Sequence, residues 1–223
     1  MTRKETYFTP EHIAAQAGEM YRGLYAEGLV KERAFTPLNS ALLVLDMQEV
    51  FAQPESHAYI PSMPAIIPGV IRLIDLYAAR NLTVIFTQHL NTVKDAGLMA
   101  GWWKDLITID HPLSALIPNL DPSKGQVICK NRYDAFWGTQ LERILHKRSI
   151  HQVVICGVMT HLCCETTARS AFMRDFEVFF MLDGTATYNR QHHLASAYNL
   201  AHGFAVPALV DQIAAKLISL PIS

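Results

Sequence analysis

The feature that most constrains the fold is an alternation, from residue 41 onward, between short β-rich apolar runs and stretches with helical periodicity. The runs rich in Val, Ile, Leu and Phe are 41–47, 82–88, 125–130, 151–158, 176–182 and 204–209. Apolar residues recur at helical spacing in 64–80, 138–148, 163–175 and 190–203. This pattern is typical of βαβ units, so we predict a three-layer α/β sandwich around a buried parallel sheet. Pro207 in the last run predicts an edge strand there.

Length and composition favour a single α/β domain, over 35–223, preceded by an N-terminal helical arm over 1–34. Half of the 223 residues are hydrophobic and 17% are charged, which supplies a buried core. Thr9 followed by Pro10 and Glu11 is typical of a helix start, and predicts a helix over about 10–29. One face of that helix is partly apolar and needs covering, so we expect a homo-oligomer.

Charge and patterning exclude several classes of partner. The net charge is −1 and no block of Lys and Arg occurs, so we expect no nucleic-acid partner. The N-terminal residues lack the apolar segment of a signal peptide, and no run approaches the ~18 apolar residues that span a bilayer. We therefore expect a cytoplasmic protein with no membrane partner. The four cysteines have no C-x-x-C spacing and are predicted to be reduced thiols.

Three chemically interesting residues follow predicted strands. Asp46 ends the first strand, Lys130 ends the third, and the turn "MTHLCC" follows the fourth. In open parallel sheets ligands bind at the carboxyl ends of strands, so these residues are candidates for one site. Other interpretations are open for each: Asp46 suits a helix cap, and Lys130 suits a solvated strand end paired with Asp134.

Cys163 is the better candidate of the two adjacent cysteines. It lies where the loop turns into the predicted helix 163–175, and a thiol at a helix N-terminus has its pKa lowered toward neutrality. Cys164 shares a helix face with Ala168 and Ala171, which suits packing on the sheet. For each of the four cysteines, the alternative is a purely structural role as a small hydrophobic residue in the core.

Three segments together resemble the signature segments of the isochorismatase-like cysteine hydrolase family, namely "LLVLDMQ", "CKNRYDAF" and "GVMTHLCCETTARSAF". The resemblance covers 38–212 and implies a six-stranded, mostly parallel sheet in the order 3-2-1-4-5-6. It also implies that Asp46, Lys130 and Cys163 form the catalytic set. The backbone N–H groups of Met159 and Cys163 would form the oxyanion hole, next to a cis Val158–Met159 peptide.

The resemblance also implies the reaction. Amide hydrolases of the family carry a cysteine at the position of Cys163, whereas isochorismatases usually carry glycine there. We therefore expect a metal-independent cysteine hydrolase that cleaves an amide or carbamoyl C–N bond of a small molecule through a thioester. "KNRYDAF" and His161 are similar to isochorismatase segments, so vinyl-ether hydrolysis stays open as an alternative. A non-catalytic oligomeric scaffold is the third interpretation.

Side chains near the predicted cleft are candidates for substrate contact. They are Phe51, Gln88, Trp102, Trp103, Tyr133, Phe136 and His161. The long irregular stretch 89–124 is a candidate lid over the substrate. Glu55 and His57 do not reproduce the Asp-x-His metal motif expected from nicotinamidases, and His89 is interpreted as a polar loop residue. We therefore predict no metal and no cofactor.

Overall fold

The computed structural model describes residues 3–220 and contains one sheet of six parallel strands in the order β3-β2-β1-β4-β5-β6. The strands are β1 (Ser40–Leu45), β2 (Thr83–His89), β3 (Gln126–Lys130), β4 (Gln152–Val158), β5 (Glu177–Ala186) and β6 (Val206–Ala208). The predicted strand order is confirmed, and the sheet is parallel throughout the described residues. The run containing Pro207 forms β6, one of the two edge strands, and the predicted edge position is confirmed.

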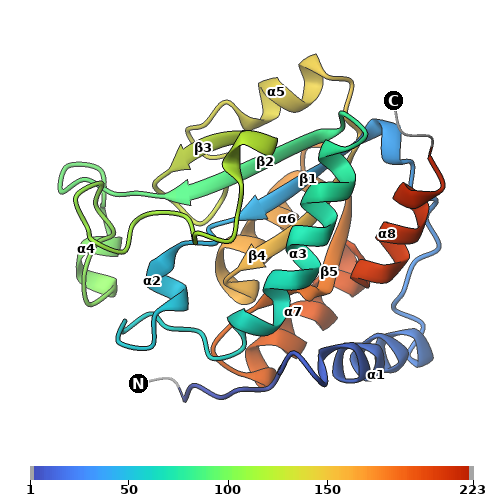
Figure 1. Cartoon of the computed structure of the whole chain (residues 1–223), viewed down its shortest axis with the longest axis horizontal. Coiled ribbons are helices and arrows are strands. Elements are labelled where there is room, and N and C mark those ends of the chain that lie inside the picture. The colour runs from blue at the N-terminus through green and yellow to red at the C-terminus, as the bar shows by residue number, and fades with distance from the viewer. Residues whose placement is uncertain (1–2, 221–223) are drawn as a thin grey trace.

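Helices cover both faces of this sheet and form the outer layers. They are α1 (Ile13–Ala26), α2 (Glu49–Ala52), α3 (Met63–Ala78), α4 (Met99–Trp102), α5 (Leu141–Lys147), α6 (Glu165–Phe172), α7 (Arg190–Gly203) and α8 (Val210–Ile218). In Figure 1, α3 runs across the front of the sheet with α8 beside it, α6 lies behind the sheet, and α5 lies above β2 and β3. Each face therefore has its own apolar core, as the continuous hydrophobic strands predict.

Strand β1 lies at the centre of the sheet, buried along its whole length. It pairs with β2 on one side and with β4 on the other, with Leu43 opposite Ile85 and Ile155. The arrowheads of β1, β2 and β3 all point toward the side of the molecule where α2 and α4 lie (Figure 1). The carboxyl ends of neighbouring strands therefore meet at one edge, where a ligand crevice is expected.

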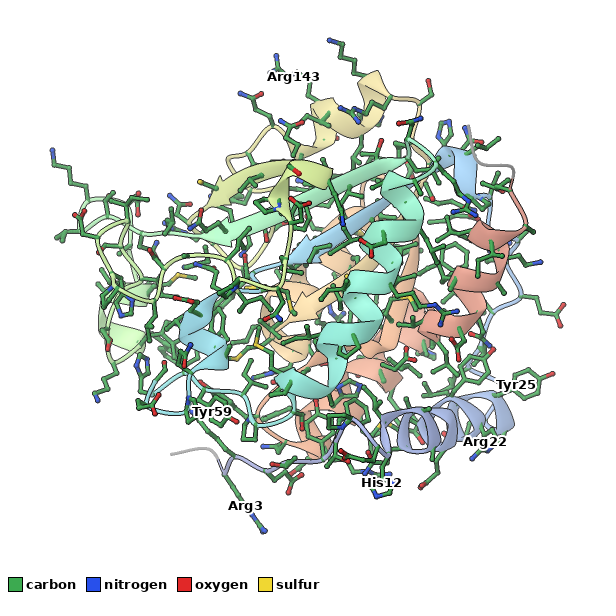
Figure 2. The ribbon with its side chains drawn as sticks, in the orientation of Figure 1. Arg3, His12, Arg22, Tyr25, Tyr59 and Arg143 are labelled. Atoms are coloured by element: carbon green, nitrogen blue, oxygen red, sulfur yellow. The ribbon has the colours of Figure 1, made fainter. Side chains whose placement is uncertain are left out.

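The N-terminal segment packs on the main core instead of standing apart from it. Tyr7 and Phe8 are buried, and Met20 and Leu24 of α1 are buried in the same cluster as β1 and α3. Figure 2 shows Arg22 and Tyr25 extending from α1 into solvent. Because the apolar face of α1 is covered within the chain, it gives no reason for a partner, and the homo-oligomer remains a prediction.

Some elements differ from the sequence-based expectation. The helix predicted over 10–29 begins at Ile13, after a turn, and ends at Ala26. Helix α8 was not predicted, although Val210, Ile213, Ala214 and Leu217 form its buried face at helical spacing. Among residues 3–220 no helix has the length and hydropathy needed to cross a membrane.

Candidate active site

Asp46 is the first residue after β1 and is completely buried. Its φ of 49° is left-handed, a conformation that Asp tolerates better than most residues. The backbone N–H of Asp46 donates to Thr87 Oγ1 at 3.1 Å, and Thr87 Oγ1 donates to Asp46 Oδ1 at 2.7 Å. The end of β2 therefore fixes both the backbone and the carboxylate of Asp46.

Strand β4 approaches β1 closely just before the site, because the residue at the crossing is glycine. Gly157 has a φ of 112°, and a Cβ atom added there would lie 2.1 Å from the carbonyl oxygen of Leu45. Only glycine combines this backbone conformation with this spacing. The Val158–Met159 peptide that follows is cis, as the family resemblance implies.

Lys130, at the end of β3, reaches across to Asp46 and Cys163. Its Nζ lies 2.6 Å from Asp46 Oδ2, donates to Cys163 Sγ at 3.4 Å and donates to the Arg132 carbonyl at 2.9 Å. Neither the Asp46 nor the Lys130 side chain is exposed to solvent. The structure thus brings the three candidate catalytic residues together, although they come from three separate segments.

The electrostatics of the pair favour its ionised form. Burial acts to raise the pKa of Asp46, but the Lys130 ammonium holds that pKa below its ordinary value. Burial likewise acts to lower the pKa of Lys130, and the Asp46 carboxylate raises it instead. Asp46 is therefore an anion and Lys130 a cation at neutral pH.

Cys163 differs from the sequence-based expectation in two respects. It lies inside a π-helical turn over Thr160–Cys164 that precedes α6, rather than at the first position of a helix. Burial, and next the Asp46 charge, raise the pKa of its thiol, and Lys130 does not reverse this. The expected thiolate at neutral pH is therefore wrong: the resting group is a thiol facing a carboxylate.

A small cavity of about 70 Å³ opens onto Cys163. Its wall is largely apolar and aromatic, with a few polar side chains. It is lined by Val50, Phe51, His57, Ala58, His89, Asn91, Met99, Trp103, Asp105, Leu106, Ile107, Tyr133, Met159, Leu162, Cys163 and Tyr188. Seven of these residues belong to the 89–124 stretch that was predicted to form a lid, and the opening and closing of that stretch remains a prediction.

Three of the seven predicted substrate contacts line this cavity, namely Phe51, Trp103 and Tyr133. The Trp103 indole N–H donates to the Tyr133 hydroxyl at 2.8 Å, which joins the 89–124 stretch to the loop after β3. Trp102, the last residue of α4, is outside the lining and 77% exposed. The two adjacent indoles therefore face different surroundings.

Gln88, Phe136 and His161 are also outside the cavity lining. Gln88 donates to the Ser114 carbonyl at 2.9 Å, because it faces the side of β2 opposite to Thr87. Phe136 is buried in the second core, with its ring centroid 5.9 Å from that of Phe176.

His161 lies two residues before Cys163 in a helical turn, so the two side chains leave on nearly opposite sides. It contacts Thr187 Oγ1 at 2.6 Å and stacks on His192, with ring centroids 4.4 Å apart. Burial, followed by the neighbouring His192, lowers the pKa of His161 to about 4.

Among the lining residues that were not predicted as cavity residues from the sequence are His89, Asn91 and Tyr188. His89 is the last residue of β2 and is buried, not a loop residue. Strand alternation is the signal that would have identified it, because residues two apart in a strand share a face. Thr87 and His89 accordingly both lie near Asp46.

Asp46, His89 and Cys163 also have the donor types of a metal site, with one ligand atom from each within 4.8 Å of the others. The Lys130 ammonium, however, already contacts Asp46 Oδ2 and Cys163 Sγ. A divalent cation would have to share these two ligands with a buried positive charge, which is electrostatically unfavourable. The donor set therefore does not suit a resident metal ion.

Comparisons with known proteins were consistent with one another. A model of the Isochorismatase domain matches residues 40–212. Nicotinamidase 3 of Arabidopsis thaliana is 36% identical over 186 residues, which are 80% of this chain and 89% of that protein. Enterobactin synthase component B of Escherichia coli K12 is 32% identical over 166 residues, 73% of this chain but only 58% of that protein. The crystal structure of a cysteine hydrolase from Pseudomonas syringae pv. phaseolicola 1448A superposes with a TM-score of 0.81 at 24% identity, covering 85% of this chain and 97% of that one.

Proposed function

The chain belongs to the isochorismatase family and is a hydrolase, and from this premise we propose that it cleaves the C–N bond of a small primary amide with Cys163 as nucleophile. The observation that carries this proposal is the position of the Cys163 thiol, which lines the cavity and lies beside both Asp46 and the Lys130 ammonium. A nucleophile within reach of a base that is itself held by a third group is typical of covalent hydrolases.

In the first half-reaction Asp46 accepts the thiol proton while Sγ attacks the amide carbon. The negative charge moves from Asp46 to the substrate oxygen, where we expect the backbone N–H groups of Met159 and Cys163 to stabilise it, at ~2.7–4 kcal/mol per donor. The proton on Asp46 then passes to the nitrogen, the C–N bond breaks, and ammonia leaves a thioester on Cys163. Giving up this proton returns Asp46 to its anionic form, which the Lys130 ammonium, charged throughout, stabilises.

In the second half-reaction water replaces ammonia. Asp46 accepts a proton from water while the water oxygen attacks the thioester carbon. The C–S bond then breaks, and the proton passes from Asp46 to Sγ. The products are a carboxylic acid and the original thiol. One carboxylate therefore serves as base and acid in both halves.

The cavity supports a small, flat substrate. Its volume of about 70 Å³ is modest, and Phe51, Trp103, Tyr133 and Tyr188 provide aromatic walls. The Arabidopsis relative, which is 36% identical over 80% of this chain, is named a nicotinamidase. Nicotinamide combines a planar ring with a primary amide, so it is the first substrate that we would test.

Vinyl-ether hydrolysis is the runner-up. That reaction needs a carboxylic acid that donates a proton to the substrate, whereas the Lys130 ammonium holds the pKa of Asp46 below its ordinary value. Asp46 therefore suits the role of base better than that of acid. The third interpretation, a scaffold without activity, is not supported, because the chain is a member of a hydrolase family.

The test is an assay of ammonia release from nicotinamide, benzamide and ureido acids, run beside an assay of isochorismate cleavage. Wild-type protein should release ammonia from at least one amide, and Cys163→Ala should release none. Isochorismate turnover that survives Cys163→Ala, with no ammonia released by the wild type, would instead support the ether hydrolase. Circular dichroism of the variant controls for folding.

A further inference from the structure

His89 carries a buried nitrogen that the reaction described above does not use. The side chain is only 8% exposed, lines the cavity, and has a ring nitrogen within 4.8 Å of the Asp46 carboxylate and of Cys163 Sγ. Nε2 lies 2.8 Å from Asn91 Oδ1. Nδ1 is buried and finds no hydrogen-bond partner within residues 3–220. An unpaired buried polar atom is costly and so points to a partner that arrives with the ligand.

The contacts of Asn91 determine which nitrogen of His89 carries the proton. Asn91 Nδ2 donates to Asp95 Oδ1 at 3.3 Å and to the Asn131 carbonyl at 3.2 Å. Rotating the amide by 180° would direct its oxygen at these two acceptors, so Oδ1 must face His89. An oxygen can only accept, so Nε2 carries the hydrogen and Nδ1 of the neutral ring carries a lone pair.

The ring is neutral and held in place. Burial, and next the Lys130 charge, lower the pKa of His89, while Asp46, Asn91 and the Arg132 carbonyl oppose this without reversing it. The His89 backbone is fixed by Gln48, whose Oε1 accepts from the His89 N–H at 2.8 Å and whose Nε2 donates to the His89 carbonyl at 3.1 Å. A fixed hydrogen-bond acceptor is thus present beside the nucleophile.

We propose that Nδ1 of His89 accepts a hydrogen bond from the leaving N–H₂ group of the substrate and so selects primary amides over esters of the same acyl group. In an attacking geometry the substrate carbonyl carbon lies ~3–3.5 Å from Sγ, and the amide nitrogen is bonded to that carbon. A group that accepts a hydrogen bond from this nitrogen must lie ~3 Å from it. One ring nitrogen of His89 lies within 4.8 Å of Sγ, a separation compatible with both distances. Because Asn91 engages Nε2, Nδ1 is the ring nitrogen left to accept from the substrate.

This inference rests on the proposed amide hydrolysis and adds the chemical class of the leaving group. An ester or ether oxygen has no hydrogen to donate, so it would leave Nδ1 unpaired and place two lone pairs near each other. His89 would contact the substrate without exchanging protons. Asp46 remains the group that carries the proton from sulfur to nitrogen.

Two substitutions separate the acceptor from the structural role of the ring. In His89→Asn the side-chain oxygen takes the place of Nδ1, and the contact with Asn91 is lost. In His89→Gln the amide reaches the place of Nε2 and keeps the contact with Asn91, but nothing replaces Nδ1. His202→Gln, on the exposed end of α7, is the matched control.

Each variant is assayed with nicotinamide and with methyl nicotinate, which share an acyl group and differ in the leaving group. The values of kcat/KM report acylation alone. We expect His89→Gln to lower kcat/KM for the amide about tenfold or more with little change for the ester, and His89→Asn to keep the wild-type amide-to-ester ratio. The control should change neither value.

Equal losses on amide and ester in both His89 variants would show a structural role only and overturn the inference. An unchanged amide-to-ester ratio in His89→Gln would overturn it too. Wild-type protein that releases no ammonia from any amide would remove the proposed function itself, a result obtained before any variant is made. If His89→Gln fails to fold, loss of the amide preference in His89→Asn overturns the inference by itself.

Discussion

The ammonium of Lys130 lies 2.6 Å from Oδ2 of Asp46, and neither side chain is exposed to solvent. The pair joins the ends of β3 and β1, which are not neighbours in the sheet, across the end of β2. Because the pKa of Asp46 is lowered in the folded protein, its ionisation stabilises the fold at pH values above the ordinary pKa of Asp, and this stabilisation is lost as the pH falls through the pKa of the folded state. Because the pKa of Lys130 is raised, its protonation stabilises the fold at pH values below the ordinary pKa of Lys, and this stabilisation is lost as the pH rises through the pKa of the folded state.

The first prediction concerns this pair. Lys130→Met leaves the Asp46 carboxylate buried without its counter-ion, and we expect the free energy of unfolding to fall by ~3–5 kcal/mol at pH 7. Urea denaturation measures the change. Adding Asp46→Asn removes the unpaired charge, so the double variant should lose less than the sum of the two single losses. Additive losses would mean that the two residues are not coupled.

The second prediction is the pH dependence of alkylation by iodoacetamide. The raised pKa of Cys163 should place the midpoint of wild-type reactivity above the free-thiol value of ~8.5. Asp46→Asn removes the negative charge but leaves the Lys130 cation, so the midpoint should move down while turnover is lost. Lys130→Ala should move the midpoint up. Stopped-time alkylation read by mass spectrometry at Cys163 distinguishes these shifts, and a wild-type midpoint near neutrality would contradict the thiol resting state.

The third prediction separates the adjacent cysteines. Cys163 lines the cavity, whereas Cys164 is fully buried in the second core with Ala168 and Ala171. Cys163→Ala should lower amide turnover by at least about 10³-fold with little loss of stability. Cys164→Ala should keep most of the turnover and cost ~1 kcal/mol of stability. Similar losses of turnover in both folded variants would contradict the assignment of Cys163 as nucleophile.

The fourth prediction concerns metal dependence. The Lys130 ammonium already contacts two of the three potential ligands, so prolonged dialysis against a chelator should leave turnover unchanged. Added Zn²⁺ should not increase it. Activity that disappears with the chelator and returns with zinc would mean that a metal contributes, with His89 as its first candidate ligand.

Much of the fold was predictable because a buried parallel sheet has a strong signature. Five of the six strands start within one residue of the predicted start, since β-branched and apolar residues run continuously there. Strand β5 extends to Ala186. Its predicted end was at 182, because the apolar run stops there and is followed by Asp183 and Gly184. A register shift between Ile155 and Gly157 accommodates these residues, and such an irregularity has no local sequence signal.

Site residues were predictable where their position along a strand is enough to place them in the site. They were less predictable where the direction of the side chain determines whether it reaches the cavity. Asp46 and Lys130 are at strand ends, and the topology brings them together with Cys163. Gln88 and His161 are near the cavity in sequence but face away from it, since alternation in a strand and rotation in a helix set their directions. The raised pKa of Cys163 depends on its complete burial beside Asp46, which only the packed structure reveals.

The 89–124 stretch divides the catalytic set between two halves of the chain. A backbone break after the exposed Asp110 would leave Asp46 on one fragment and both Lys130 and Cys163 on the other. The two fragments would share the β1–β4 and β2–β3 pairings, which bury the centre of the sheet. Neither fragment alone would hold a base and a nucleophile, so turnover by a mixture would report reassembly of the whole sheet. The protein is therefore suited to fragment complementation, with its own reaction as the signal.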